Sequence, residues 1–225
     1  MRWRARLAGE ALTQGEGFVP LRLPSSAFSA HPGPQLHSND FPASVCVSIN
    51  DQVVHGIPGN RRLHEGDIVS VDVGVKKGGF YGDGAWTFPV GEISEDKRRL
   101  LTTAEASLYR GIEQARAGRR VHDISSAVQK HVEKEGFAVV RALVGHGVGR
   151  SLHEEPQIPN FGKPGTGEVL RSGMTLAIEP MVNAGEDDVQ VEPDGWTVRT
   201  ADGSPSAHFE HTVLVTDDEP EILTT

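Results

Sequence analysis

Hydrophobic and polar residues alternate along several short stretches of this chain, and a period of two is typical of β-strands. The clearest stretch covers residues 68–75, where valine occupies every second position and the residues between are mostly small or acidic. Turn residues Lys77-Gly78-Gly79 follow, and residues 80–90 are expected to return as the second strand of a hairpin. Residues 45–54 predict another hairpin, with its turn at Asn50-Asp51.

Two amphipathic helices are predicted in the middle of the chain. Ser94 can cap the first, Glu95 and Asp96 suit its positive end, and Gly118 is expected to end it. Its apolar stripe would be Leu101, Ala104, Leu108, Ile112 and Ala115, and that of the second helix Val121, Ile124, Val128 and Val132. Gly136 is expected to end the second helix, and residues 137–223 have the pattern of strands separated by turns. This order predicts an α/β (α+β) fold.

Residues 1–43 do not share this pattern. Prolines, serines and glycines interrupt any regular period over residues 15–42. Before them, one face of a short helix could be lined by Trp3, Leu7, Ala11 and Leu12. We therefore expect an atypical, shortened and partly disordered segment over residues 1–43. The folded domain is expected over residues 44–225.

Composition narrows the class of protein. The formal net charge of −9 argues against a general nucleic-acid binder, which would present lysine and arginine to phosphates. A single cysteine, Cys46, excludes internal disulfides and suits a reducing compartment. No apolar run approaches the roughly 20 residues needed to span a bilayer, and no apolar stretch typical of a secretory signal follows the first arginines. We expect a cytoplasmic protein.

Asp72 and Asp83 are unusual, because aspartate is depleted in strands. If the hairpin closes on a two-residue turn at Lys77-Gly78, the two aspartates face each other directly, with Cβ atoms roughly 4.5–5.5 Å apart. Such a pair repels unless a cation lies between the carboxylates or one carboxyl is protonated. The alternative is a solvated pair on an exposed strand, but small neighbours, among them Gly82 and Gly84, leave room for a cation.

Three further residues suit metal binding. Glu179 and Glu210 lie in apolar stretches, where a carboxylate is rarely buried without a partner. Each alone could form a structural ion pair, and His146, between glycines, could be a loop residue. Four carboxylates and one imidazole together suit Mn²⁺, Fe²⁺, Co²⁺ or Zn²⁺. Two ions sharing the carboxylates could activate water and polarise a carbonyl, a combination that serves hydrolysis.

Seven segments resemble type I methionine aminopeptidases, the pita-bread metallopeptidases of family M24. They are Ser44-Val-Cys-Val-Ser-Ile-Asn-Asp, Val54-His-Gly-Ile-Pro, Gly66-Asp-Ile-Val-Ser-Val-Asp-Val-Gly, Tyr81-Gly-Asp-Gly-Ala-Trp-Thr-Phe, Gly145-His-Gly-Val-Gly-Arg-Ser-Leu-His-Glu-Glu-Pro, Ile178-Glu-Pro-Met and Glu210-His-Thr. The resemblance covers residues 41–223 almost without a break. It implies a curved antiparallel sheet flanked by helices, in two related halves with a shortened N-terminal half.

The resemblance also implies residue roles. Asp72 is similar to the carboxylate that chelates one ion, Asp83 and Glu210 to the bridging carboxylates, and His146 and Glu179 to the ligands of the second ion. Glu179 would also carry the proton, and both His55 and His153 would contact the scissile amide. Phe41, Cys46 and Trp196 match positions around the methionine pocket. The remaining histidines are given no role.

The function that the resemblance implies is removal of the initiator methionine from nascent polypeptides, favoured when the second residue is small. The enzyme would act as a monomer, with nascent chains at the ribosome as its substrates. Two departures raise an alternative: few residues precede Ser44, and Ser38 replaces one aromatic of the pocket wall. A catalytically weakened or non-catalytic homologue is therefore the alternative, and a relative that cleaves before proline or acts on an amidine is a further rival.

Overall fold

The computed structural model describes residues 41–224, so the predictions made for residues 1–40 lie outside the described part of the chain. The strands are β1 (Cys46–Ile49), β2 (Gln52–Val54), β3 (Ile68–Asp72), β4 (Val75–Lys77), β5 (Phe80–Gly82), β6 (Gly84–Pro89), β7 (Ala138–Val139), β8 (Val144–Gly147), β9 (Glu154–Pro159), β10 (Thr175–Ile178), β11 (Met181–Asn183), β12 (Val189–Val191), β13 (Val198–Thr200), β14 (Ser206–His208), β15 (Glu210–Leu214) and β16 (Glu221–Ile222). The helices of this part are α2 (Glu95–Ile112) and α3 (Val121–Lys134).

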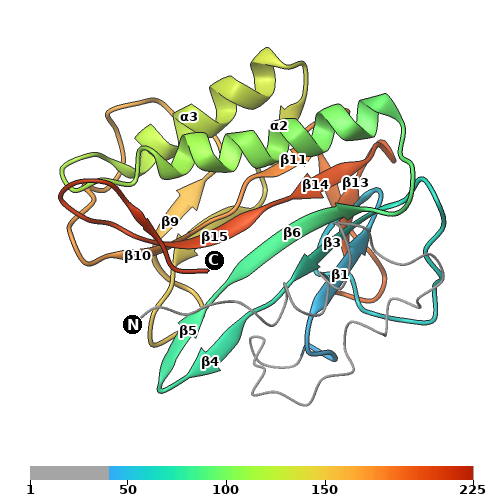
Figure 1. The fold of residues 1–225 in the computed structure, drawn as a ribbon, viewed down its shortest axis with the longest axis horizontal. Coiled ribbons are helices and arrows are strands. Elements are labelled where there is room, and N and C mark those ends of the chain that lie inside the picture. The colour runs from blue at the N-terminus through green and yellow to red at the C-terminus, as the bar shows by residue number, and fades with distance from the viewer. Residues whose placement is uncertain (1–40, 225) are drawn as a thin grey trace.

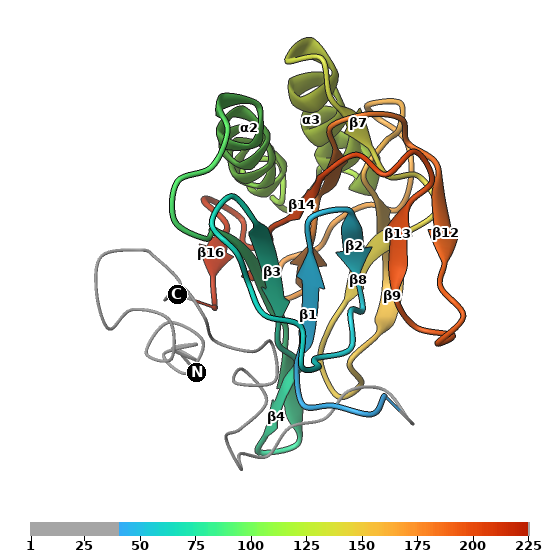
Figure 2. The same ribbon diagram turned by 90° about the vertical axis from the view of Figure 1, so that its right-hand side faces the viewer.

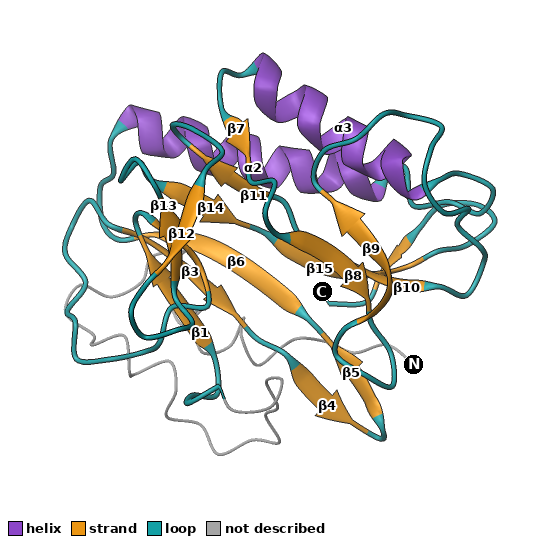
Figure 3. Ribbon diagram, turned by 180° about the vertical axis from the view of Figure 1, so that it is seen from behind, coloured by secondary structure: helices purple, strands orange, loops and turns teal. Residues whose placement is uncertain are grey.

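A curved antiparallel sheet organises the domain (Figures 1 and 3). Its strand order is β1-β3-β6-β15-β10-β8-β9, and β16 adds to β15. Strands from the first and second halves of the chain therefore meet where β6 lies beside β15. Smaller sheets of β14-β11-β7, β12-β13-β2 and β4-β5 complete the structure.

The two helices lie together over one face of the sheet (Figure 2). Ile178 and Val213 of the sheet are buried in one cluster with Leu108 and Val128 of the helices. Because side chains alternate along a strand, Glu179 and Thr212 point toward the opposite face. Helix packing thus occupies one face of the sheet and leaves the other face for polar side chains.

Neither helix in residues 41–224 is long and apolar enough to cross a membrane.

The start of α2 is as predicted, but its end is not. Ser94 caps the helix, and its side-chain oxygen accepts a hydrogen bond from the Lys97 backbone nitrogen at 3.3 Å. The helix ends at Ile112 instead of Gly118. The N–H groups of Ala117 and Gly118 donate to the carbonyls of Thr216 and Leu170, so they are not available to continue the helix. Tertiary hydrogen bonds therefore keep residues 117 and 118 out of the predicted helix.

The hairpin that carries the two aspartates has a different register from the predicted one. Its turn is Gly78-Gly79, both with positive φ, and the β3–β6 ladder pairs Asp72 with Ala85 instead of Asp83. The prediction of directly opposed aspartates was therefore wrong by two residues. A shift of two keeps every side chain on its face, so the two aspartates remain diagonal neighbours.

The turn at Asn50-Asp51 is present, with Asn50 at φ 56°. The two strands beside it do not form one ladder, because β1 pairs with β3 whereas β2 pairs with β13. The chain after β2 still returns to β1, where the Val47 N–H donates to the Gly56 carbonyl at 2.8 Å. The expected hairpin is thus divided between two sheets.

This close return makes Gly56 a site of steric constraint. A Cβ at Gly56 would lie 2.2 Å from the Val47 carbonyl oxygen, whereas a Cβ at Gly59 would meet nothing within 4 Å. We expect Gly56→Ala to lower the free energy of unfolding by about 3 kcal/mol, because β1 must move to admit the methyl group. Gly59→Ala should change it by less than about 0.5 kcal/mol. Urea unfolding of both variants measures this, and equal stabilities would contradict the constraint.

Candidate metal centre

Five adjacent strands of the curved sheet bring the five predicted metal ligands together. Asp72 ends β3, Asp83 directly precedes β6, Glu210 begins β15, Glu179 directly follows β10, and His146 lies in β8. These strands are consecutive neighbours in the sheet. Each predicted ligand therefore lies in or directly beside a different strand, and four of the five lie at a strand end.

Three of these residues lie close enough to share one ion. Ligand atoms of Asp83, His146 and Glu210 all lie within 4.8 Å of one another, and all three residues are buried. Oε1 of Glu210 is buried without a hydrogen-bond partner within residues 41–224. A buried carboxylate oxygen without a donor is costly unless a cation compensates it.

Asp83 is held by an unusual backbone contact. The hydroxyl of Thr212 accepts from the Asp83 N–H at 2.9 Å and donates to the Asp83 carbonyl at 2.8 Å. One side chain thus replaces the ladder contacts at the break between β5 and β6. Asp83 is fixed in this break against β15, the strand that carries Glu210.

The hydrogen bonding of His146 leaves one ring nitrogen for a cation. Its Nδ1 lies 2.9 Å from the Gly147 carbonyl, which only accepts, so this nitrogen carries the hydrogen. The other nitrogen, Nε2, lies 3.4 Å from Oε1 of Glu179 and 3.8 Å from Oδ2 of Asp83. A lone pair facing two carboxylates requires a proton or a cation between them. A metal-binding histidine usually has this arrangement, with a backbone carbonyl accepting from its other nitrogen.

Burial and mutual repulsion disfavour the charged forms of the carboxylates. Burial, reinforced by Asp83, raises the pKa of Asp72 to about 8. Burial also raises the pKa of Glu179 to about 8, with His146 opposing the shift and Asp83 adding to it. The pKa of Glu210 is raised well above its usual value by burial and by the neighbouring acids. Divalent cations would relieve this repulsion, so the residues present fit a metal centre.

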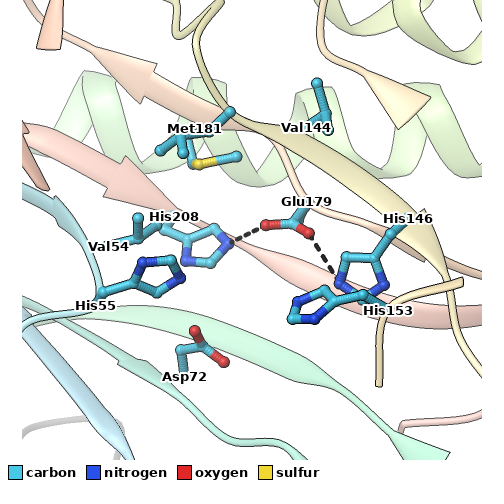
Figure 4. A pocket seen from close by; sticks show the side chains of 10 residues that line it. Val54, His55, Asp72, Val144, His146, His153, Glu179, Met181 and His208 are labelled. Carbon is cyan, nitrogen blue, oxygen red and sulfur yellow. Dashed lines mark ion pairs between the residues drawn. The ribbon is translucent and has the colours of Figure 1, made fainter. Parts of the chain in front are cut away.

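His55 and His153 line the same pocket as Asp72, His146 and Glu179 (Figure 4). His55 directly follows β2 and has φ 57°, and the rings of His153 and His146 meet edge to face at 4.3 Å. Partial burial, followed by the charge of His146, lowers the pKa of His153. A neutral imidazole in this position can donate a hydrogen bond to a bound molecule.

The three residues expected around a methionine side chain lie elsewhere in the site. Cys46 pairs directly with Asp72 across the β1–β3 ladder, and its thiol donates to the Asp72 carboxyl. Burial raises the pKa of Cys46. Phe41 and Trp196 meet edge to face, with ring centroids 5.3 Å apart. None of these three lines the pocket shown in Figure 4, although Trp196 precedes β13, which pairs with β2 beside His55.

His208 also lines this pocket, although no role was predicted for it from the sequence (Figure 4). Its ring is buried, and burial lowers its pKa. The available signal was its position two residues before Glu210, because residues at this spacing share one face of an extended chain. Met181, directly opposite His208 in the β11–β14 ladder, and Leu143 also line the pocket.

Comparison with known proteins agrees with this geometry. The model of metallopeptidase family M24 matches residues 25–217. Methionine aminopeptidase 1 of Bacillus subtilis is 55% identical over 186 residues, which cover 83% of this chain and 75% of that protein. The methionine aminopeptidase structure from Thermotoga maritima has a TM-score of 0.92 and 44% identity, covering 98% of this chain and 93% of that one.

More distant structures share the fold alone. The prolidase from Pyrococcus furiosus has a TM-score of 0.73 at 20% identity, covering 98% of this chain and 61% of that one. Together with the Thermotoga maritima structure, it confirms the expected pita-bread fold with its curved antiparallel sheet.

The raised carboxyl pKa values predict how pH affects the metal-free protein. The unfolded chain loses the Asp72 proton near pH 4, whereas the folded protein keeps it to about pH 8. Between these values the folded state holds more protons, so the free energy of unfolding falls as pH rises. Asp72→Asn should therefore stabilise the metal-free protein at pH 8 and have little effect near pH 4.

Urea unfolding in a metal chelator at several pH values tests this prediction. Asp218→Asn, at an exposed position, is the matched control and should leave the pH dependence unchanged. If the free energy of unfolding of Asp72→Asn depended on pH as in the parent protein, the raised pKa of Asp72 would be contradicted.

Proposed function

This chain belongs to metallopeptidase family M24, and from that premise we propose that it removes the N-terminal methionine from polypeptides by metal-dependent hydrolysis. The observation that carries the proposal is the buried group of Asp83, His146 and Glu210, in which a carboxylate oxygen has no partner within residues 41–224. The methionine aminopeptidases of Bacillus subtilis and Thermotoga maritima supply the reaction class by their similarity.

We infer that two divalent ions bind, because four carboxylates would over-neutralise a single one. Asp72 would chelate one ion, His146 and Glu179 would bind the other, and Asp83 and Glu210 would bridge them. Cobalt, manganese, iron and zinc all suit this set of oxygen and nitrogen donors. When bound, such a pair supplies an activated water at neutral pH and polarises the scissile carbonyl.

The side chains around the centre suit the remaining steps. Glu179 lines the pocket with its carboxylate beside His146, so it can take a proton from the attacking water and give it to the leaving amine. His55 and His153 line the same pocket and can donate hydrogen bonds to the scissile amide. Because its pKa is lowered, His153 is a neutral donor at physiological pH.

The methionine side chain would lie against Phe41 and Trp196. Their edge-to-face contact forms an aromatic wall, and large aromatic surfaces bind apolar side chains well. We propose nascent chains with a small second residue as substrates, processed by a cytoplasmic monomer close to the ribosome. Ser38, the position that raised the alternative of a weakened enzyme, lies outside the described residues.

The rival functions have less support. A non-catalytic homologue would be expected to lose metal ligands, whereas all five candidates are present and converge on the sheet. The proline-directed rival has no comparable support, because the prolidase from Pyrococcus furiosus is 20% identical and shares the fold alone.

Methionine release from a Met-Ala-Ser peptide tests the proposed function. The Co²⁺- or Mn²⁺-loaded protein should release methionine, and Asp83→Asn should lower kcat/KM by about a thousandfold or more, because a bridging carboxylate is lost. Asp218→Asn should retain the parent activity. No release by the folded, metal-loaded protein would reject the proposal, and preferential cleavage of an Ala-Pro peptide would favour the proline-directed rival.

Trp196→Ala tests the aromatic wall separately from the metal centre. We expect KM for the methionyl peptide to rise about tenfold, because an apolar contact to the side chain is lost, while kcat changes little. Co²⁺ affinity measured by calorimetry should stay constant. Val191→Ala, at an exposed position of the neighbouring β12, is the control. An unchanged KM in Trp196→Ala would place the methionine side chain elsewhere.

A further inference from the structure

His208 is a buried histidine whose ring makes no ordinary hydrogen bond. Its exposed fraction is 1%, and neither Nδ1 nor Nε2 has a hydrogen-bond partner within residues 41–224. Leaving a buried polar group unpaired costs about 1–3 kcal/mol. A buried imidazole therefore needs a compensating role, and the roles already proposed for the site do not include this residue.

The backbone of His208 is held firmly. Its N–H donates to the hydroxyl of Thr87 at 2.9 Å, and the same hydroxyl donates to the His208 carbonyl at 2.8 Å. Ser70 lies 2.8 Å from that hydroxyl and extends the contact to β3. On its other side, β14 pairs with β11, where His208 faces Met181. The imidazole therefore projects from a fixed point into the pocket.

The ring faces the far oxygen of Glu179 (Figure 4). Oε2 of Glu179 lies 3.5 Å from Nε2 of His208, and Oε1 lies 3.4 Å from Nε2 of His146. Glu179 is thus held between two histidines, one for each oxygen. Only one of them, His146, is a candidate metal ligand.

We propose that His208 is a positioning residue that donates from Nε2 to Oε2 of Glu179 and so directs Oε1 toward the metal centre. This inference rests on the proposed function, since Glu179 is the candidate ligand and proton carrier. Nδ1 of His208 meets no acceptor in the described part of the chain, so the tautomer with its hydrogen on Nε2 is the one that gains a bond. A contraction of a few tenths of an ångström from 3.5 Å would complete it.

This role differs from a purely structural one in a measurable way. A structural histidine would stabilise the fold, so an apolar replacement would lower the melting temperature. A positioning histidine costs stability, because its other ring nitrogen, Nδ1, stays buried without a partner within residues 41–224. An apolar residue of similar size should then keep or raise the melting temperature of the metal-free protein, while the metal centre is impaired.

The experiment compares His208→Leu, which cannot donate, with His208→Gln, which retains an N–H donor. We expect His208→Leu to raise the Kd of the first Co²⁺ about tenfold, because losing a hydrogen-bond partner of a metal ligand commonly weakens metal binding to this extent. Its kcat for a Met-Ala-Ser peptide should fall about tenfold with KM nearly unchanged. His208→Gln should stay within about threefold of the parent Kd. His64→Leu, at an exposed position, controls for loss of a histidine.

The possible results distinguish a positioning role of His208 from a structural one, and failure of that role from failure of the proposed function. A parent Kd and kcat in His208→Leu would overturn the positioning role, as would equal losses in the Leu and Gln variants. A lowered melting temperature of the metal-free Leu variant together with an unchanged Kd would assign His208 to the fold. If the parent protein releases no methionine yet binds Co²⁺, the proposed function fails while the Kd comparison still decides the role of His208.

Discussion

The carboxylates of Asp72, Asp83, Glu179 and Glu210 meet inside one small volume of the sheet, where water cannot separate their charges. Burial and mutual repulsion favour protonation of Asp72, Glu179 and Glu210, and divalent cations would favour the ionised forms instead. The rest of the domain holds these carboxylates close together despite their repulsion. The helices stabilise one face of the sheet, so that the other can carry groups that oppose folding.

Two threonine hydroxyls hold the backbone of residues in the site. Thr212 bonds to both backbone polar groups of Asp83, and Thr87 does the same for His208. Both contacts occur where a strand is interrupted, and a single hydroxyl satisfies a donor and an acceptor at once. The interruptions let Asp83 and His208 turn into the site without leaving buried backbone groups unpaired.

Local patterns predicted most of the elements, whereas tertiary contacts decided the details. The alternation around Asp72 placed this residue on the correct face, but register depends on turn geometry, and the turn formed at Gly78-Gly79. The end of α2 could not be found locally, because the competing acceptors belong to Leu170 and Thr216. The acidic ligand candidates were identifiable from carboxylates in strands and apolar stretches. For His208 the spacing from Glu210 was a weak signal, because the importance of this residue comes from the oxygen of Glu179 that it faces.

The distribution of the site over five adjacent strands has a consequence for the order of folding. Asp72 and Glu210 lie far apart in the sequence, so the centre is built almost wholly from non-local contacts, which form late in folding. An ion in solution meets no assembled site on the unfolded chain and cannot act as a nucleus. Once the sheet has closed, the same ion joins five strands that must separate again during unfolding. Bound metal would therefore slow unfolding far more than it speeds folding.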